Sequence, residues 1–328
     1  MIALHHAFAI TIALTACFAV RYASASEYPT KPIRIIAQFT PGTSTDILAR
    51  IVAQKMGEDW GQHVIVDNRP GAGGVVGTEL GAKATPDGYT LTMAVSSAFG
   101  ITPTLYSKLP YDAIRDFAPI ANLGLTPQTL VASQSAPFKT VKEFVAAAND
   151  KPAQINYASL GAGSTSHLTM EMFRAAAGIQ LNHVPFKGSP DAHTQLIGGQ
   201  IPVMFDAIPA VRPHIQSGKL RGLGIGTLKR SPFVSDLPTI AESGYPGFEA
   251  VGWIGIAAPA QTPPAILDKL NAQMVKILNQ PDVKERLNTL AFTPVGDTRR
   301  SLPPTSSPKS RNGARRSRSP APRRINAR

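Results

Sequence analysis

Short runs of branched apolar residues alternate with amphipathic stretches through the first hundred residues of the chain. Residues 33–39, IRIIAQF, and residues 64–67, VIVD, are bounded by turn residues and are too short for helices, which is typical of buried strands. Residues 46–60 between them place apolar side chains at helical spacing. A helix of small residues at 78–84 and a strand at 91–95 are the last elements predicted in this part of the chain. This strand–helix alternation predicts a parallel sheet with right-handed crossovers.

The same alternation begins again near Leu125. The predicted strands cover residues 129–133, 155–159, 181–186, 201–207 and 220–226, and the predicted helices cover residues 140–150, 167–178 and 191–199. Thr140 and Glu143 have the spacing of a capping box at the start of the first of these helices. Two late helices, at residues 264–280 and 281–291, can pack back on the first set. We therefore expect an α/β protein with two lobes and a cleft between them.

Positive charge is concentrated at the carboxyl end. The formal net charge is +12, but ten of the 33 Lys and Arg residues lie at or after Arg299, where there is no Asp or Glu. The other 23 basic residues nearly balance 21 acidic ones, so the body of the chain does not indicate a nucleic-acid groove. The single cysteine, Cys17, excludes disulfides within the chain, iron–sulfur clusters and Cys-ligated zinc.

Residues 1–25 have the pattern of an export signal. The apolar stretch at residues 7–20 is too short for a comfortable membrane span, and the residues ASA before Ser26 form a small-x-small cleavage site. We expect cleavage after Ala25 and a periplasmic mature chain. Lipidation at Cys17, which follows LTA, is a second interpretation, and a retained anchor is a third. Each of them places the protein outside the cytoplasm.

Two loops share the chemistry of an anion site. They are PGTSTD at residues 41–46 and GAGSTSH at residues 161–167, and each follows a predicted strand and opens a predicted helix. Ligands of open parallel sheets bind at the carboxyl ends of the strands, where helix N-termini offer unpaired N–H donors and partial positive charge. Two such loops facing each other would hold a carboxylate without Lys or Arg. Asp46 fits both a helix cap and a ligand site, and the two roles are compatible.

Motifs for other functions are missing or misspaced. NRPGAGG lacks the third glycine of a dinucleotide fingerprint because Val76 occupies that position, and no P-loop motif is present. The histidines show no metal-ligand spacing, so no metal or cofactor is expected. Ser164 and His167 lie on one helix turn without a G-x-S-x-G elbow, which disfavours a hydrolase; His167 is either structural or in the cleft. Lys187 follows a predicted strand and Asp206 lies at the end of another, and each is either at the cleft rim or in a solvated turn.

Several ordered stretches together resemble the periplasmic receptors of tripartite tricarboxylate transporters, the TctC or Bug family. They include YPTKPIRIIAQFTPGTSTDILAR, VIVDNRPGAGGVVGTE, INYASLGAGSTSHL, GIQLNHVPFKGSPDA and LIGGQIPVMFDAIPAVRPHIQSGKLRGLGI, and the likeness covers residues 28–298. The resemblance implies a two-lobed clamp of the periplasmic-binding-protein type, with each lobe a mostly parallel sheet flanked by helices. It implies that residues 26–124 and 245–298 form the first lobe and that residues 125–244 form a second lobe inserted into it.

The resemblance also implies where a ligand binds. In the family the two strand–helix loops hold the ligand carboxylate, often with ordered waters, and selectivity varies at positions matching Phe39, Ser97, Lys187 and Asp206. An acid matching Asp206 can face the amine of an amino-acid ligand. The complete set of expected ligand-binding residues is Phe39, Pro41, Gly42, Thr43, Ser44, Thr45, Asp46, Ser97, Ser159, Gly161, Gly163, Ser164, Thr165, His167, Lys187 and Asp206.

The chain departs from the family pattern in two places. Thr40 and Thr43 replace a Pro and a Gly in the first loop, so ligand identity does not carry over, and the β-carbon of Thr43 favours a negative φ. Residues 299–328 are rich in Pro, Ser and Arg where the family has an amphipathic helix, and such a composition predicts disorder. Codons can be chosen for residues 299–313 so that the frame one base earlier reads PAEFAAYIKSEIEEW, which motivates the hypothesis of a reading-frame slip after Thr298. A natural basic tail is the alternative, and the coding DNA distinguishes them.

The resemblance implies capture of a small organic carboxylate and its delivery to the permease subunits of a membrane transporter. We expect a monomer that binds a di- or tricarboxylate, an aromatic acid or an acidic amino acid, without catalysis and without nucleic acid as a partner. A second functional interpretation is that the protein senses its ligand and acts as the partner of a membrane sensor kinase. A hydrolase is the third possibility and is disfavoured by the missing motifs.

Overall fold

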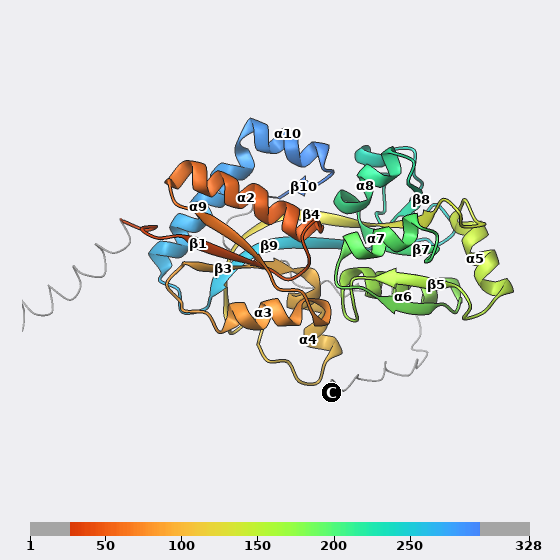
Figure 1. Cartoon of the computed structure of the whole chain (residues 1–328), viewed down its shortest axis with the longest axis horizontal. Helices are drawn as coiled ribbons and strands as arrows, with labels where there is room; N and C mark the ends of the chain where they lie inside the picture. Colours follow the sequence, from red (N-terminus) through yellow and green to blue (C-terminus); the bar gives the residue numbers. More distant parts are fainter. Residues whose placement is uncertain (1–26, 296–328) are drawn as a thin grey trace, which may run out of the picture.

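The computed structural model describes residues 27–295, which form an α/β protein of two lobes joined side by side (Figure 1). Lobe I, as we call it, contains three parallel strands in the order β2-β1-β3. Their bounds, with those of the helices between them, are β1 (Ile33–Ala37), α2 (Ser44–Trp60), β2 (Val64–Asn68), η1 (Ala72–Gly74), α3 (Val75–Ala82), β3 (Thr90–Val95), η2 (Ser97–Ile101) and α4 (Thr102–Leu105). The predicted strands and helices of this half are confirmed, with bounds that shift by a few residues.

Lobe II is built on the parallel set β6-β5-β7. Its elements are α5 (Val141–Asp150), β5 (Asn156–Ser159), α6 (Thr165–Ala177), β6 (Asn182–Pro185), α7 (Ser189–Ile197), β7 (Val203–Ala207), α8 (Ile208–Gln216), β8 (Leu220–Ile225) and η3 (Pro232–Val234). Thr140 caps α5 as expected, since its side chain accepts a hydrogen bond from the Glu143 N–H at 3.1 Å. Helix α8 was not predicted from the sequence, because Pro209 and Pro213 interrupt its pattern.

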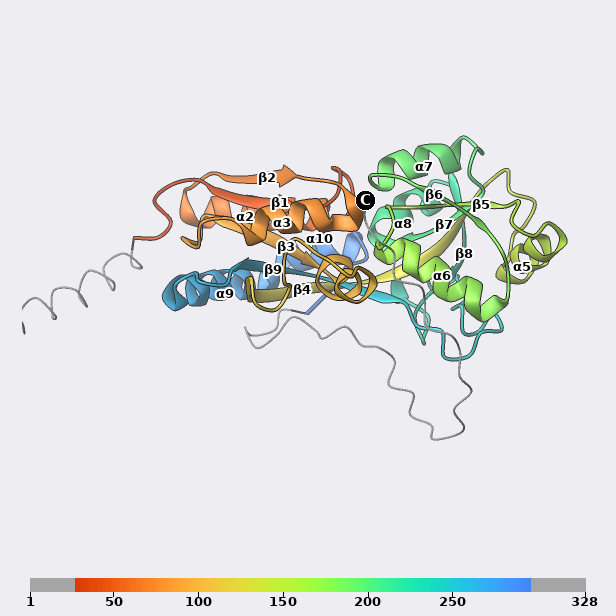
Figure 2. The same cartoon turned by 90° about the horizontal axis from the view of Figure 1, so that it is seen from below.

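Two long antiparallel strands connect the lobes (Figure 2). Strand β4 (Phe117–Ser133) pairs with β9 (Val251–Pro259) through Pro127 and then with β7 and β8 from Gln128 onward. The continuous strand order is β2-β1-β3-β9-β4-β7-β5-β6, so the sheet is mixed, with parallel pairs at its two ends and antiparallel pairs in the middle. The expected two-lobed clamp is confirmed, and its central pairs add an antiparallel part that the strand–helix alternation did not indicate.

Each lobe has its own hydrophobic core. The first core packs Ile35, Leu48 and Ile256, and the second packs Phe144, Phe173 and Phe205, all of them fully buried. Because β4 leaves the first core after Leu123 and joins the second at Leu130, a lobe boundary falls between these two residues. We therefore retain, as a proposal, the division of the chain into residues 26–124 with 245–298 and residues 125–244.

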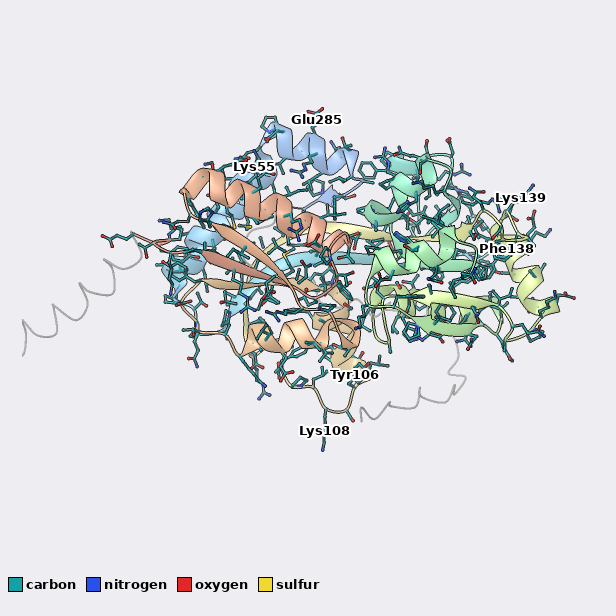
Figure 3. All side chains as sticks on the ribbon, in the orientation of Figure 1. Lys55, Tyr106, Lys108, Phe138, Lys139 and Glu285 are labelled. Atoms are coloured by element: carbon teal, nitrogen blue, oxygen red, sulfur yellow. The ribbon has the colours of Figure 1, made fainter. Side chains whose placement is uncertain are left out.

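The last described elements pack back on lobe I. Helices α9 (Pro264–Asn279) and α10 (Pro281–Thr289) lie beside α2, and the short strand β10 (Thr293–Pro294) pairs with β4. Lys55 of α2 makes an ion pair of 2.6 Å with Asp282 of α10, on the face where Figure 3 labels Lys55 and Glu285. No helix within residues 27–295 is long and apolar enough to cross a bilayer. The expected signal at 1–25 and the tail at 299–328 lie outside the described residues.

Candidate functional site

A cavity lies between the two lobes, beside the carboxyl ends of the parallel strands. The space measures about 450 Å³, a figure that includes the open mouth of the cavity. Its walls come from Phe39, Thr43, Ser44, Thr45, Val95, Ser96, Ser97, Thr126, Gln128, Leu160, Ser164, Thr165, Ser166, Ser189, Asp206, Ala207, Trp253 and Ile254. These wall residues, all within the described chain, include no Lys or Arg, and Asp206 is the one acidic residue among them.

The first polar wall is the N-terminus of α2. Thr43 is the N-cap, with φ −75° as expected for a residue with a β-carbon, and its Oγ1 accepts from the Asp46 N–H at 3.4 Å. The same hydroxyl donates to the Thr40 carbonyl at 3.0 Å, which fixes the turn. A helix leaves its first N–H groups without intrahelical partners, so those of Ser44 and Thr45 remain available beside the cavity. This end of α2 can therefore accept an anion.

Asp46 has a different role from the expected one. The cap is Thr43 and not Asp46, and Asp46 is absent from the cavity wall. Its buried carboxylate accepts from the Gly42 N–H and from Asn68 Nδ2, each at 2.9 Å, and from Arg50 Nε at 3.0 Å. Asp46 thus ties the loop to the helix behind it, and its negative charge is matched by Arg50.

The second polar wall is the N-terminus of α6. Ser164 is its N-cap: its hydroxyl accepts from the His167 N–H at 3.2 Å and donates to the Gly161 carbonyl at 2.7 Å. This leaves the N–H groups of Thr165 and Ser166 beside the cavity. The Thr165 hydroxyl lies 3.1 Å from the Ser96 hydroxyl of lobe I, so the two lobes touch here. The expected pair of facing strand–helix loops is therefore present.

The rest of the second loop supports it from behind. Gly161 and Gly163 have φ of +99° and +79°, values that favour glycine, and Gly163 packs against Tyr106 of lobe I, labelled in Figure 3. The His167 ring accepts from the Gly163 N–H at 3.4 Å and lies 4.3 Å from the His183 ring. Neither His167 nor Ser159, which hydrogen-bonds His183 at 2.5 Å, belongs to the cavity wall.

The pKa values of the two histidines behind this loop fit that structural position. Burial lowers the pKa of His167 below its usual value. The pKa of His183 falls to about 4, first because of burial and then because of the charge of His167. Both rings are therefore neutral near pH 7 and contribute no charge to the cavity.

Three buried oxygens at the cavity wall have no hydrogen-bond partner among the described residues: Ser44 Oγ, Ser189 Oγ and Gln128 Oε1. Ser189 is the first residue of α7, a helix whose N-cap, Gly188, supplies no side-chain hydrogen bond. Buried polar groups are nearly always paired, and an unpaired one costs about 1–3 kcal/mol. These three groups lie at the wall of one cavity, where a bound ligand or ordered water can pair with them.

Asp206 is the charged residue of the wall, at the end of β7. Its Oδ2 lies 3.0 Å from His193 Nε2, and its Oδ1 accepts from the Ala207 N–H at 2.7 Å. Asp206 and His193 are both nearly fully buried, so the pair is shielded from water. The apolar part of the wall includes Phe39 and Trp253, which can contact a carbon skeleton.

The sixteen expected site residues divide into two groups. The cavity wall contains Phe39, Thr43, Ser44, Thr45, Ser97, Ser164, Thr165 and Asp206. The residues outside it are Pro41, Gly42, Asp46, Ser159, Gly161, Gly163, His167 and Lys187. Lys187 is exposed, on the loop before α7.

Sequence reasoning missed a third group of wall residues. It consists of Val95, Ser96, Thr126, Gln128, Leu160, Ser189, Ala207, Trp253 and Ile254, whereas Ser166, also in the wall, lies in the predicted loop 161–167 although it was not singled out. Ser189 had a usable signal, because it follows a glycine after a predicted strand, as the loop serines do. Gln128 and Trp253 had none: Gln128 precedes the predicted strand 129–133, which is only the end of β4, and Trp253 lies on β9, which the pattern did not predict.

Comparisons with known proteins identify the family to which this chain is similar. The model of the tripartite tricarboxylate transporter family receptor matches residues 48–302. The protein BugT of Bordetella pertussis is 38% identical over 273 residues, which are 83% of this chain and 84% of that protein. A protein from the tcbD-tcbE intergenic region of Pseudomonas sp. strain P51 is 37% identical over 270 residues, covering 82% of this chain and 80% of the relative.

Solved structures also resemble this chain over most of its length. An R. palustris protein with adipate has a TM-score of 0.81 and 32% identity, covering 83% of this chain and 91% of that one. MatC from Rhodopseudomonas palustris with bound malate has a TM-score of 0.78 and 33% identity, covering 81% and 90%. Within residues 27–295, no group of three or more His, Cys, Asp or Glu residues could hold a metal ion. The chain belongs to the tripartite tricarboxylate transporter receptor family of periplasmic solute-binding proteins.

Proposed function

We propose that this protein captures a small organic carboxylate between its lobes and delivers it to the membrane permease of a tripartite transporter. The observation that carries the proposal is the cavity wall, where the N-termini of α2 and α6 face each other and the hydroxyls of Ser44 and Ser189 have no partner among residues 27–295. Unpaired N–H and O–H donors are complementary to a carboxylate, and helix dipoles favour its charge. Di- and tricarboxylates, aromatic acids and acidic amino acids are the ligand classes.

The structural neighbours with adipate and malate support a carboxylate ligand. The apolar walls at Phe39 and Trp253 suit a short carbon skeleton between polar ends. The wall chemistry is that of a binding site, so we propose a receptor without catalytic activity. We propose that it acts as a monomer, because one chain supplies the whole cavity wall. The expected contacts are made by the residues of the cavity wall, and Asp46, Gly161 and Gly163 shape the loops.

A thermal-shift screen tests the binding part of the proposal. Mono-, di- and tricarboxylates and acidic amino acids are added to the purified protein, with the neutral methyl esters of the same acids as controls. A ligand at 100 times its dissociation constant stabilises the folded state by about 2.7 kcal/mol, so a clear rise in Tm is expected for at least one acid and for none of the esters. No shift with any acid contradicts the proposal.

The delivery part needs a transport measurement. Uptake of the labelled acid into membrane vesicles that contain the permease should require the liganded protein. Binding without support of uptake, together with activation of a membrane sensor kinase, would favour the signalling role instead. Turnover of the bound acid, followed by NMR during a long incubation, would contradict a role in binding alone.

A further inference from the structure

Gln128 occupies a fixed position at the floor of the cavity, in the middle of β4 where that strand passes from one lobe to the other. Its backbone N–H donates to the Ala250 carbonyl at 3.0 Å, and its carbonyl accepts from the Gly226 N–H at 2.8 Å. The side chain is 3% exposed and forms part of the cavity wall. The strand pairing therefore leaves the Gln128 amide few positions to occupy.

The orientation of this amide is set by its neighbour. Gln128 Nε2 donates to the Thr126 carbonyl at 3.2 Å. A carbonyl oxygen can only accept, so the reversed amide would bring two acceptors together. Nε2 is therefore engaged with Thr126, and Oε1 is the amide atom left without a hydrogen bond; it is buried and has no partner among the described residues. The floor of the cavity thus presents an unpaired acceptor.

The second acceptor at this end of the cavity is Asp206. Ala207, the next residue, pairs directly with Gln128 between β7 and β4. Strands β4 and β7 therefore contribute acceptors to the cavity wall, whereas the N-termini of α2 and α6 contribute donors. A simple alkyl carboxylate offers acceptors alone, so it can pair with the donors at the helix ends but cannot donate a hydrogen bond to Gln128 Oε1.

We propose that the ligand carries a hydrogen-bond donor, a hydroxyl or an ammonium group, in addition to its carboxylate, and that Gln128 Oε1 accepts from this donor. The inference rests on the proposed function and narrows it from carboxylates in general to hydroxy- or amino-substituted acids. Sites built to hydrogen-bond a ligand group reject the analogue that lacks it, because the buried partner is then left unpaired. Gln128 is on this basis a residue that determines specificity.

The test compares acids that differ by one donor. Calorimetric affinities are measured for propionate against lactate, succinate against malate, and glutarate against 2-hydroxyglutarate, with alanine, aspartate and glutamate as the amino arm. We consider the pair of acids with the highest affinity for the wild-type protein. In that pair, the hydroxy or amino acid is expected to bind about tenfold or more tightly than the unsubstituted acid. The hydroxy and amino arms then identify which donor is preferred.

The variant Q128M replaces the amide by an apolar side chain of similar length. The affinity ratio between the paired acids is expected to fall to about threefold or less, since the unpaired Oε1 acceptor has been removed. The matched control is T129V, on the next position of β4, which removes a buried and unpartnered hydroxyl that is not part of the cavity wall. The ratio should persist in T129V.

Three outcomes overturn the inference. Equal wild-type affinities for plain and donor-bearing acids contradict it while the proposed function stands. A ratio that is lost in D206N but kept in Q128M assigns the donor to Asp206 and not to Gln128. Failure of every acid to bind contradicts the proposed function as well. The wild-type comparison does not depend on the folding of any variant.

Discussion

Thr40, in the loop before α2, lies directly against Gly188, in the loop before α7. A β-carbon at position 188 would be 1.7 Å from Thr40 Oγ1 and 2.9 Å from the Thr40 β-carbon. Gly188 has φ −176° and ψ 173°, an extended backbone that any residue adopts. The need for glycine therefore comes from Thr40 and not from the backbone. Because the two loops belong to different lobes, this contact exists only when the lobes are close together.

The variant G188A should impair closure of the lobes over a ligand. Overpacking at a tight contact costs about 1–3 kcal/mol, and here that cost falls on the closed form, so affinity for the best acid should fall about tenfold to hundredfold. Calorimetry measures the affinity, and the ligand-free Tm should change little because the extended backbone is unstrained. The double variant T40G/G188A removes the obstructing side chain and should recover much of the lost affinity. Wild-type affinity in G188A alone would show that the bound form does not contain this contact.

Ser189 should contribute to binding and not to folding. Its hydroxyl is buried without a partner in the described chain, so S189A should leave the ligand-free stability unchanged or slightly higher. A hydrogen bond to a carboxylate is worth about 1.5–3 kcal/mol, so the affinity for the acid should drop about tenfold or more. Urea unfolding and calorimetry measure the two quantities.

T262V is the control for this serine. Thr262 has a hydroxyl that is also buried and has no partner within the described part of the chain, but it is not part of the cavity wall. It should lose no affinity. If the two variants weaken binding equally, the hydroxyl of Ser189 has no special role in the cavity.

Asp46 should contribute to folding stability more than to ligand affinity, the opposite of Ser189. The variant D46A removes hydrogen bonds to Gly42, Asn68 and Arg50 and should lower the free energy of unfolding by about 2 kcal/mol. Its effect on affinity should be indirect and smaller than that of S189A, because the carboxylate is not at the cavity wall. A loss of affinity without a loss of stability would place Asp46 in contact with the ligand after all.

The two serine- and threonine-rich loops could be predicted from the sequence, because a strand end followed by glycine and short hydroxyl residues has a local physical meaning. Ser164 caps α6 and Thr43 caps α2 by such local contacts. The role of Asp46 was harder to predict, because its partner Asn68 is 22 residues away and becomes its neighbour only through the pairing of β1 with β2.

The floor of the cavity could not be predicted from the sequence. Gln128 lies on β4, where Pro119, Gly124 and Pro127 interrupt the pattern before the predicted segment 129–133. Trp253 lies on β9, which shows no clean alternation. The pairing of β4 with β9 joins residues more than a hundred positions apart, and the register shifts twice along it. Long-range register of this kind depends on the packing of both lobes, which a local pattern does not encode.

His183 should make the protein sensitive to acid. Burial, followed by the charge of His167, lowers the pKa of His183 to about 4, whereas an exposed histidine in the unfolded chain has a pKa near 6.5. Between these values the unfolded state binds more protons than the folded state, so the free energy of unfolding falls as pH decreases from about 6.5 to about 4. Above pH 6.5 this contribution is fully present. Urea unfolding at several pH values should show a shallower decline in H183N, and H63N, which changes a histidine outside this cluster, should keep the wild-type slope. Equal slopes in all three proteins would mean that His183 is not the group that titrates.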